Sequence, residues 1–205
     1  MPDPRRSDPY ARRWRLLARG VAAPVGRLLF APRIEGAEHV PAPGTGALLA
    51  CKHDSFLDSL LVTNLSSRPV RFMGAVGWLR LPVVGWALRA CGVFPVHRGR
   101  GDRDAVTRAA ALAREGALVG IFPEGRLVRG RLVGPLRRGG ARIALEAGVP
   151  VIPVALGLRR GRGRSFVIAG PPIASAGSVV ELTALVMAEL QRLQDAGHRG
   201  AAAGP

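Results

Sequence analysis

The chain has 205 residues, of which 48% are hydrophobic and 21% are charged. That length suits a single domain with a substantial core, and the hydrophobic fraction excludes an intrinsically disordered chain. The 30 Lys and Arg residues outnumber the 14 Asp and Glu residues, which gives a formal net charge of +16. The expected partners are therefore polyanions: nucleic acid, an anionic membrane surface or a phosphate-bearing substrate.

The N-terminal segment, residues 1–35, is predicted to contain a basic amphipathic helix over about residues 11–30. Apolar side chains recur there at helical spacing, with arginines on the opposite side: Trp14, Leu17, Val21, Val25 and Leu28 against Arg12, Arg15 and Arg19. Pro24 is expected to kink this helix. Such a helix can lie in the headgroup region of a membrane or pack on the domain, and the sequence leaves both open.

The sequence predicts no membrane-spanning segment. Its first residues lack the apolar centre of a secretory signal, and its longest apolar stretch, residues 81–88, is too short to cross a bilayer. Cys51 and Cys91 form no CxxC pair and no zinc-type spacing with histidine, so we expect buried, reduced thiols and no bound metal. The expected location is the cytoplasmic face of a membrane, with the protein attached peripherally.

Residues 36–195 are predicted to form one α/β domain, followed by a flexible tail at 196–205. Short apolar runs typical of strands fall at residues 47–52, 70–75, 92–97, 118–122, 151–156 and 166–170. Helical patterns lie near residues 55–65, 77–90, 102–115, 136–147 and 178–195, the last opening with a Ser178–Glu181 capping box. Strands that alternate with helices at this interval indicate a largely parallel sheet flanked by helices.

The stretch CKHDSFLD, residues 51–58, places His53 directly after the first of these strands. Ser55 and Asp58 have the spacing that begins a helix, so His53 should lie in the turn before the helix and Asp58 in its first turn. From there the ring can donate one N–H to the carboxylate and keep its other nitrogen free as a general base. The alternative is that Asp58 only caps the helix and His53 only fills a loop.

Further polar residues follow later strands of the predicted sheet. Arg98 comes after one strand, and Glu124, Gly125 and Arg126 come after another. Because the carboxyl ends of strands in an open α/β sheet converge on one crevice, we expect these residues near His53. A base, a carboxylate and two guanidinium groups together favour a phosphate-bearing substrate whose hydroxyl is deprotonated, although either arginine alone is typical of a solvated loop.

Four stretches between about residues 45 and 160 resemble the glycerolipid acyltransferase family, typified by the bacterial 1-acylglycerol-3-phosphate acyltransferases. They occur in the family's order and at similar intervals: KHDSFLD, GVFPVHRGRGD, FPEGR and GVPVIPVAL. The resemblance implies acyl transfer with His53 as the general base, oriented by Asp58. It also implies a set of substrate-binding residues: Arg98, Glu124, Gly125 and Arg126.

Two positions depart from the family pattern. Lys52 stands where the family has an asparagine before the histidine, and Arg126 and Leu127 follow Gly125 where the family has threonine and arginine. The family's phosphate-binding arginine is thus absent at Leu127, and its role would pass to Arg126 or Arg129. These departures leave the expected fold unchanged and make the acceptor lipid the open question.

The resemblance also implies the co-substrates. The donor would be acyl-CoA or an acyl-acyl carrier protein, the acceptor 1-acylglycerol-3-phosphate, and the product phosphatidate, with no tightly bound cofactor. A different lipid acceptor and an inactive lipid-binding relative stay open as alternatives. A nucleic-acid-binding module is disfavoured because one Tyr and six Phe give little base stacking, and a serine hydrolase because the chain lacks a G-x-S-x-G elbow.

Overall fold

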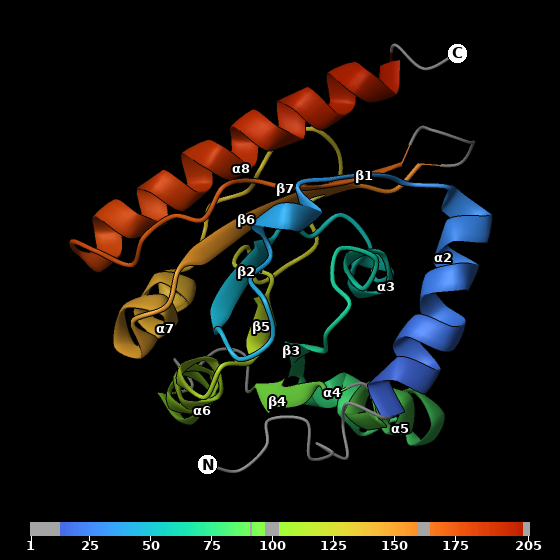
Figure 1. The fold of residues 1–205 in the computed structure, drawn as a ribbon, viewed down its shortest axis with the longest axis horizontal. Coiled ribbons are helices and arrows are strands. Elements are labelled where there is room, and N and C mark those ends of the chain that lie inside the picture. The colour runs from blue at the N-terminus through green and yellow to red at the C-terminus, as the bar shows by residue number, and fades with distance from the viewer. Residues whose placement is uncertain (1–12, 91, 97–102, 160–164, 203–205) are drawn as a thin grey trace.

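The structure is a computed structural model that describes residues 13–90, 92–96, 103–159 and 165–202. A seven-stranded sheet runs through it in the order β1-β7-β6-β2-β5-β3-β4 (Figure 1). The strands are β1 (Arg33–Glu35), β2 (Ala47–Cys51), β3 (Val70–Ala75), β4 (Phe94–Val96), β5 (Leu118–Ile121), β6 (Val151–Gly157) and β7 (Phe166–Ala169). Five neighbouring pairs are parallel and β6–β7 is antiparallel, which confirms the predicted, largely parallel α/β sheet.

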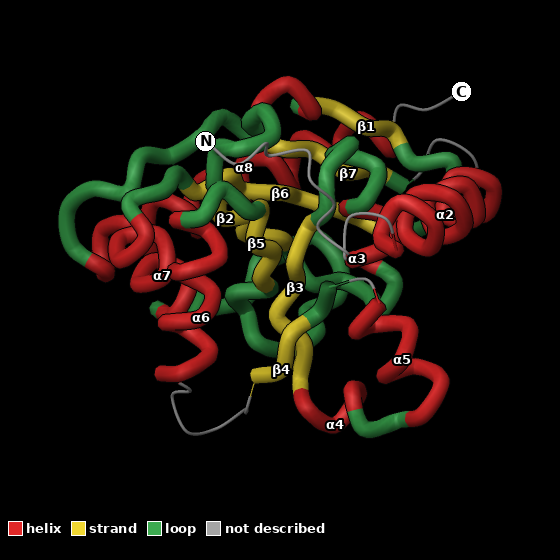
Figure 2. Tube along the Cα trace, turned by 60° about the horizontal axis from the view of Figure 1, so that its bottom comes forward, coloured by secondary structure: helices red, strands yellow, loops and turns green. Residues whose placement is uncertain are grey.

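Helices cover both faces of this sheet (Figure 2). The helical elements are η1 (Arg15–Ala22), α2 (Ala23–Phe30), η2 (Ala37–His39), α3 (Asp58–Val62), α4 (Val76–Leu79), α5 (Pro82–Ala90), α6 (Arg103–Arg114), α7 (Gly139–Ala147) and α8 (Val179–Ala202). One core cluster joins α6, α7 and α8 to one face of β2 and β5, and a second joins α3 to the opposite face. The single domain therefore has three layers with the sheet in the middle.

The central strand β2 is buried on both sides because helices cover both faces. Leu48 and Ala50 pack into the cluster of α6, α7 and α8, whereas Cys51 packs into the cluster of α3. This double burial explains why β2 forms a continuous apolar run in the sequence. Since β2 pairs with both β5 and β6, its carboxyl end brings His53 to the middle of the sheet edge. Cys51 is buried as expected, and Cys91 lies outside the described residues.

The N-terminal helical segment buries a different face from the predicted one. Residues Arg15–Ala22 form a π-helix, η1, which continues directly into α2. Trp14 is buried as expected, but Val25 and Leu28 are 44% and 85% exposed. A π-helix closes i→i+5 hydrogen bonds and turns each residue by a smaller angle, so it rotates later residues away from a stripe based on 3.6 residues per turn. The segment is helical, and its contact with a membrane stays a prediction.

Two further segments differ from the predicted pattern. Strand β1 pairs in parallel with β7 at the sheet edge, and its three residues are too short to give a periodic signal. Helix α8 begins with the expected capping box, in which the Ser178 N–H donates to Glu181 Oε2 (2.8 Å) and the Glu181 N–H to Ser178 Oγ (3.2 Å). The helix then continues to Ala202, so residues 196–202 of the expected tail are helical.

Among all described helices, none is both long and apolar enough to span a bilayer.

Candidate active site

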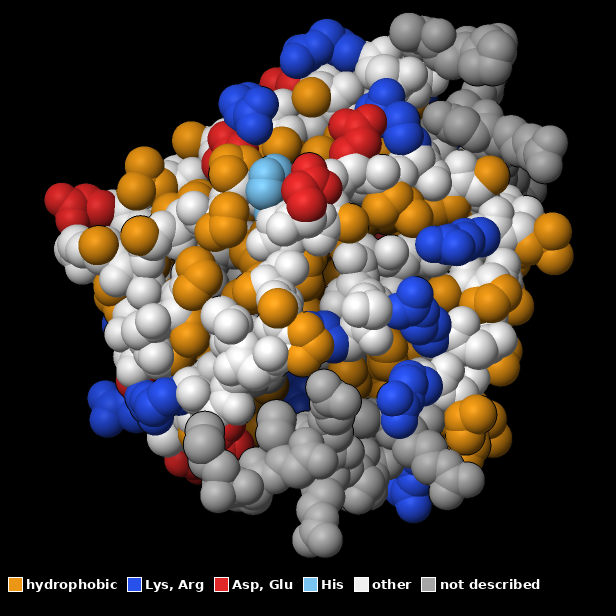
Figure 3. Space-filling model, in the orientation of Figure 1, with side chains coloured by type: hydrophobic (Ala, Val, Ile, Leu, Met, Phe, Trp, Pro, Cys, Tyr) orange, Lys and Arg blue, Asp and Glu red, His pale blue; other side chains and the backbone are white. Residues whose placement is uncertain are grey.

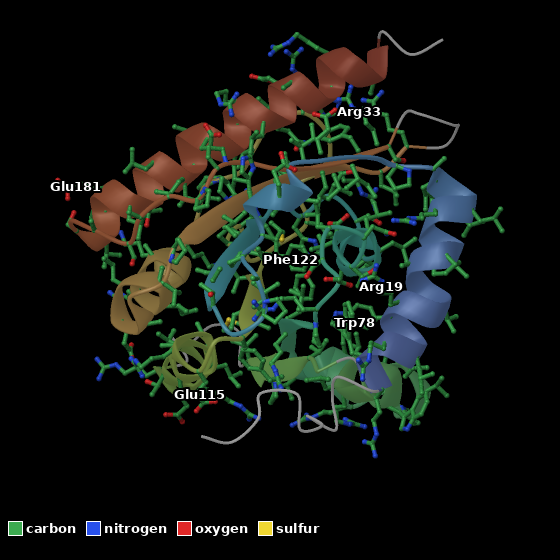
Figure 4. All side chains as sticks on the ribbon, in the orientation of Figure 1. Arg19, Arg33, Trp78, Glu115, Phe122 and Glu181 are labelled. Carbon is green, nitrogen blue, oxygen red and sulfur yellow. The ribbon has the colours of Figure 1, made fainter. Side chains whose placement is uncertain are left out.

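His53 lies in the turn between β2 and α3. Its Nδ1 is 2.9 Å from Oδ2 of Asp58, the first residue of α3, so the predicted pairing is present. An ionised carboxylate can only accept, so Nδ1 donates its proton and the neutral ring carries its lone pair on Nε2. One face of the ring stacks on Phe122 with the centroids 4.0 Å apart, near the centre of the molecule (Figure 4). The imidazole is therefore held both at Nδ1 and on one face.

Asp58 holds the backbone of the turn as well as the ring. Its Oδ2 accepts the N–H groups of Asp54 (2.7 Å) and Ser55 (2.8 Å), while the Ser55 hydroxyl accepts from Leu57 (3.2 Å) and not from Asp58. The Asp58 side chain is completely buried, and within the described part of the chain its Oδ1 has no hydrogen-bond partner. Burial raises the pKa of Asp58, because its effect outweighs the hydrogen bonds that favour the carboxylate.

Glu124 binds the backbone of His53 and is not among the residues that line the neighbouring cavity, so its expected contact with substrate stays a prediction. Its Oε2 accepts the backbone N–H of His53 (2.8 Å) and its Oε1 accepts that of Gly134 (2.7 Å). The Nζ of Lys52 lies 3.8 Å from Oε1. Burial raises the pKa of Glu124, and the two hydrogen bonds and the charge of Lys52 lower it by less. Glu124 thus supports the turn that carries His53.

A cavity of about 690 Å³ opens beside His53 at the carboxyl ends of β3, β4 and β5. Apolar side chains form much of its wall: Met73, Ala75, Val96, Ile121, Leu136 and Ile143. Four arginines from α6, from α7 and from the segment before α7 also line it: Arg103, Arg137, Arg138 and Arg142. An apolar wall next to guanidinium groups suits an amphiphilic anion. Nowhere in the described ranges do three or more His, Cys, Asp or Glu residues form a group that could hold a metal ion.

The structure separates the residues expected to bind substrate. Gly125 lines the cavity beside His53. Arg126 and Arg129 are both exposed, and neither belongs to the cavity lining. Arg98 lies outside the described residues. The guanidinium groups that do line the cavity belong to other positions of the chain.

Arg137 is a cavity residue that the sequence did not identify as a site residue. Its N–H donates to the carbonyl of Pro123 (2.8 Å), which brings the segment before α7 back to the end of β5. Gly125 has a φ of +65°, a conformation that favours glycine, and a Cβ there would lie 2.5 Å from Nε of Arg137, so a larger residue would displace the Arg137 side chain. The available signal was the stretch PLRRGGARIALEAG, in which a basic pair directly precedes a helix.

Comparisons with known proteins give consistent matches. A protein-family model described as Acyltransferase matches residues 31–157. The chain is 35% identical over 125 residues to 1-acyl-sn-glycerol-3-phosphate acyltransferase BAT2, chloroplastic, of Brassica napus, covering 60% of this chain and 36% of that protein. It is 34% identical over 149 residues to Lyso-ornithine lipid O-acyltransferase of Pseudomonas aeruginosa, covering 72% of this chain and 54% of that protein.

A solved structure shares the fold. The crystal structure of the 1-acyl-sn-glycerophosphate acyltransferase from Thermotoga maritima superposes with a TM-score of 0.72 and 19% sequence identity, covering 90% of this chain and 78% of that chain. By contrast, this chain spans about one third of the Brassica protein and about half of the Pseudomonas protein. The segment matched by the family model, residues 31–157, contains His53, Asp58, Glu124 and Arg137.

Proposed function

Because the chain belongs to the acyltransferase family, we propose that it moves a fatty acyl group from an acyl thioester to the hydroxyl of a lysophospholipid, with lysophosphatidate as the acceptor. The observation that carries this proposal is the 2.9 Å hydrogen bond between His53 Nδ1 and Asp58 Oδ2 at the wall of an arginine-lined cavity. It supplies an oriented base at the place where a phosphate-bearing acceptor would be held.

In the proposed reaction, Nε2 of His53 removes the hydroxyl proton of the acceptor as the oxygen attacks the thioester carbonyl. The C–S bond then breaks, and the imidazolium returns the proton to the leaving thiolate. Asp58 stabilises the imidazolium through the Nδ1 hydrogen bond. The acceptor oxygen is itself the nucleophile, so the route needs no acyl-enzyme.

The acceptor phosphate is assigned to the arginines on the α7 side of the cavity. The Arg137 side chain lies against Gly125, and both Gly125 and His53 line the cavity. Arg138 and Arg142 line the same cavity. Guanidinium groups bind phosphate through paired, charge-assisted hydrogen bonds. In this assignment Arg137 performs the role that the family resemblance implied for Arg126 or Arg129.

A phosphate-free acceptor is the second candidate. It is favoured by the 34% identity to a protein named for a lyso-ornithine lipid and by the exposed position of Arg126 outside the cavity. The same base and the same attack on the thioester would serve this acceptor. The two candidates differ only in what the cavity arginines bind.

Membrane contact is assigned to the side of the molecule formed by η1, α2 and α5, where Figures 1 and 2 both place α2 and α5. Apolar side chains are exposed on these helices, among them Leu28, Val83 and Trp86. Basic side chains lie among apolar ones over the α2 side of Figure 3, and Arg15 and Arg19 of η1 are exposed. Each arginine near an anionic surface adds roughly 1 kcal/mol of binding. Binding to anionic liposomes, measured by sedimentation, should weaken at high salt. Equal binding to neutral liposomes would contradict an electrostatic contribution of the arginines.

The reaction is tested by offering purified protein acyl-CoA or acyl-acyl carrier protein together with lysophosphatidate or lyso-ornithine lipid. We expect transfer to lysophosphatidate that disappears in His53→Ala. Transfer to lyso-ornithine lipid alone would keep the mechanism and change the acceptor. Transfer to no acceptor, with either donor, would overturn the proposed function.

The phosphate assignment is tested on the same assay with two arginine variants. Arg137→Ala should raise KM for lysophosphatidate about 10-fold or more, because a charge-assisted hydrogen bond to the phosphate is lost. Arg126→Ala removes an exposed arginine from the same region of the chain. A larger rise of KM in Arg126→Ala than in Arg137→Ala would indicate that Arg126 binds the phosphate, as expected from the sequence.

A further inference from the structure

Lys52 is the only lysine among the 30 basic residues of the chain; all the others are arginines. The ammonium group of lysine is a compact point charge and the guanidinium group of arginine a planar fork, so the two side chains need different surroundings when buried. Lys52 directly follows β2, precedes His53 and is completely buried. A buried cation is costly unless it is paired and hydrogen-bonded, so the partners of Lys52 indicate its role.

The partners of Lys52 are the groups that hold the backbone of His53. Its Nζ donates to the carbonyl of Val128 and lies 3.8 Å from Oε1 of Glu124. Val128 in turn donates its N–H to the carbonyl of His53 (2.7 Å), and Glu124 Oε2 accepts the N–H of His53 (2.8 Å). Both polar backbone groups of His53 are therefore bonded to residues that Lys52 contacts.

We propose that Lys52 is a positioning residue for the base: its buried ammonium group joins the end of β2 to the loop at residues 124–134 and so sets the place of the His53 imidazole against Asp58. The inference rests on the proposed function, in which His53 is the base. Lys52 itself does not line the cavity, so it acts through Glu124 and Val128 and not on the substrate.

The ammonium group also keeps Glu124 in the form that the turn requires. Glu124 accepts two N–H groups, from His53 and Gly134, and only the carboxylate offers both oxygens as acceptors. The titratable groups facing Glu124 are Lys52 and His53, and burial of Glu124 already raises its pKa. Without Lys52 this pKa rises further, so Glu124 takes up a proton at a higher pH and the His53 backbone loses its acceptor.

The first test observes the imidazole directly and needs no substrate. ¹H–¹⁵N spectra of the ring nitrogens are recorded for the wild type and for Lys52→Met, with His53→Gln to assign the signals. Arg192→Met is the matched control, because it removes a cation from the exposed ion pair with Glu189 on α8. We expect shifted His53 signals in Lys52→Met and unchanged ones in the control. Wild-type His53 signals in a folded Lys52→Met protein would overturn the proposal.

The second test measures the effect on turnover. Lys52→Met should lower kcat about 10²-fold with KM nearly unchanged, as a small misplacement of a catalytic group does. It should also move the acidic limb of kcat/KM to higher pH, and Lys52→Met/Glu124→Gln should lose that movement because position 124 then carries no carboxyl group to titrate. A purely structural lysine would lower activity without moving the limb, and this result would contradict the proposal.

The outcomes separate this inference from the proposed function. A wild type that transfers no acyl group sinks the proposed function, while the spectra still decide whether Lys52 positions His53. If Lys52→Met does not fold, an amine-reactive label on the native wild type replaces it. Lys52 is the only side-chain amine in the sequence. We expect it to stay unlabelled until the protein unfolds, and rapid native labelling would overturn its role as a buried clamp.

Discussion

The turn at residues 53–58 and the loop at residues 124–134 each contribute one buried carboxylate that binds His53. Asp58 is 0% exposed and Glu124 is 4% exposed. Burial raises the pKa of both carboxyl groups. They differ in the atom of His53 that they hold, because Asp58 accepts from the ring nitrogen Nδ1 and Glu124 from the backbone N–H.

The difference shows that the role of a buried carboxylate follows from the atom it binds. A carboxylate on the ring fixes the tautomer and faces the charge that forms during proton transfer. A carboxylate that accepts the backbone N–H fixes only the position of the residue that carries the ring. Asp58 should therefore affect the chemical step, and Glu124 the placement of the base. Substitutions at His53, Asp58 and Glu124 separate the two roles, and the largest effect is expected at His53, which both carboxylates bind.

His53→Ala should have the largest effect, because it removes the ring and leaves both carboxylates in place. We expect a loss of acyl transfer of about 10⁴-fold, the upper end of what general-base catalysis contributes. The variant should stay folded, since the backbone bonds of His53 to Glu124 and Val128 do not involve its side chain. Transfer rates and circular dichroism check the prediction, and a folded variant with near-normal activity would contradict it.

Asp58→Asn should rank next, with a loss of about 10³-fold in kcat. Asparagine can still accept the N–H groups that Asp58 binds, but it carries no charge to stabilise the imidazolium. The loss should therefore appear in kcat more than in KM. Steady-state kinetics with the acceptor varied measure the split. A change confined to KM would show that Asp58 acts on binding and would remove the contrast with Glu124.

The fold was predictable where local sequence patterns decide it. The apolar run of β2 and the helical period of α7 each stand alone in the sequence, so both elements were expected where they occur. Strand β1 was not expected, because only its pairing with β7 defines it. The exposed face of α2 was not expected either, since the π-helix before it changes the period on which the prediction was based. Elements defined by a partner or by an irregular turn leave no local signal.

The same distinction applies to the site. His53 and Asp58 are five residues apart, so their spacing revealed the pair. The hydrogen bond between Glu124 and His53 joins residues 71 positions apart in the sequence. The position of Glu124 after a strand indicated a carboxylate near the site but not which group it binds. The family resemblance pointed to Arg126 or Arg129, whereas Arg137 lines the cavity because the path of the chain brings the segment before α7 back to the end of β5.

Glu124→Gln tests the backbone side of the comparison. Glutamine has one acceptor oxygen for the two N–H groups of His53 and Gly134, so one buried donor loses its partner, which costs about 1–3 kcal/mol of unfolding free energy. We expect a loss of about 10²-fold in kcat from the displaced ring. Glu181→Gln is the control, because its carboxylate also accepts a backbone N–H but lies at the exposed start of α8. An equal loss of activity in the control would contradict a specific role of Glu124.

The smallest expected effect is on the pH dependence of stability, and it bears on the raised pKa of Asp58. Between the ordinary value of about 3.9 and the raised value, the folded state keeps the Asp58 proton that the unfolded state has lost, so stability falls as the pH rises through this window. The amide that replaces this carboxyl in Asp58→Asn does not titrate, so the variant should gain on the wild type across the window, by about 1.4 kcal/mol for each unit of pKa shift.

Asp195→Asn is the control of opposite sign for this pH dependence. The hydrogen bond from Arg131 lowers the pKa of Asp195, so the stability that this carboxylate contributes is present above its ordinary pKa and is lost as the pH falls. The variant should therefore lose ground to the wild type as the pH rises. Urea unfolding at several pH values measures both differences. If the unfolding free energy of Asp58→Asn depends on pH in the same way as that of the wild type, burial does not penalise the charge of Asp58. Asp58 and Glu124 would then not share a raised pKa.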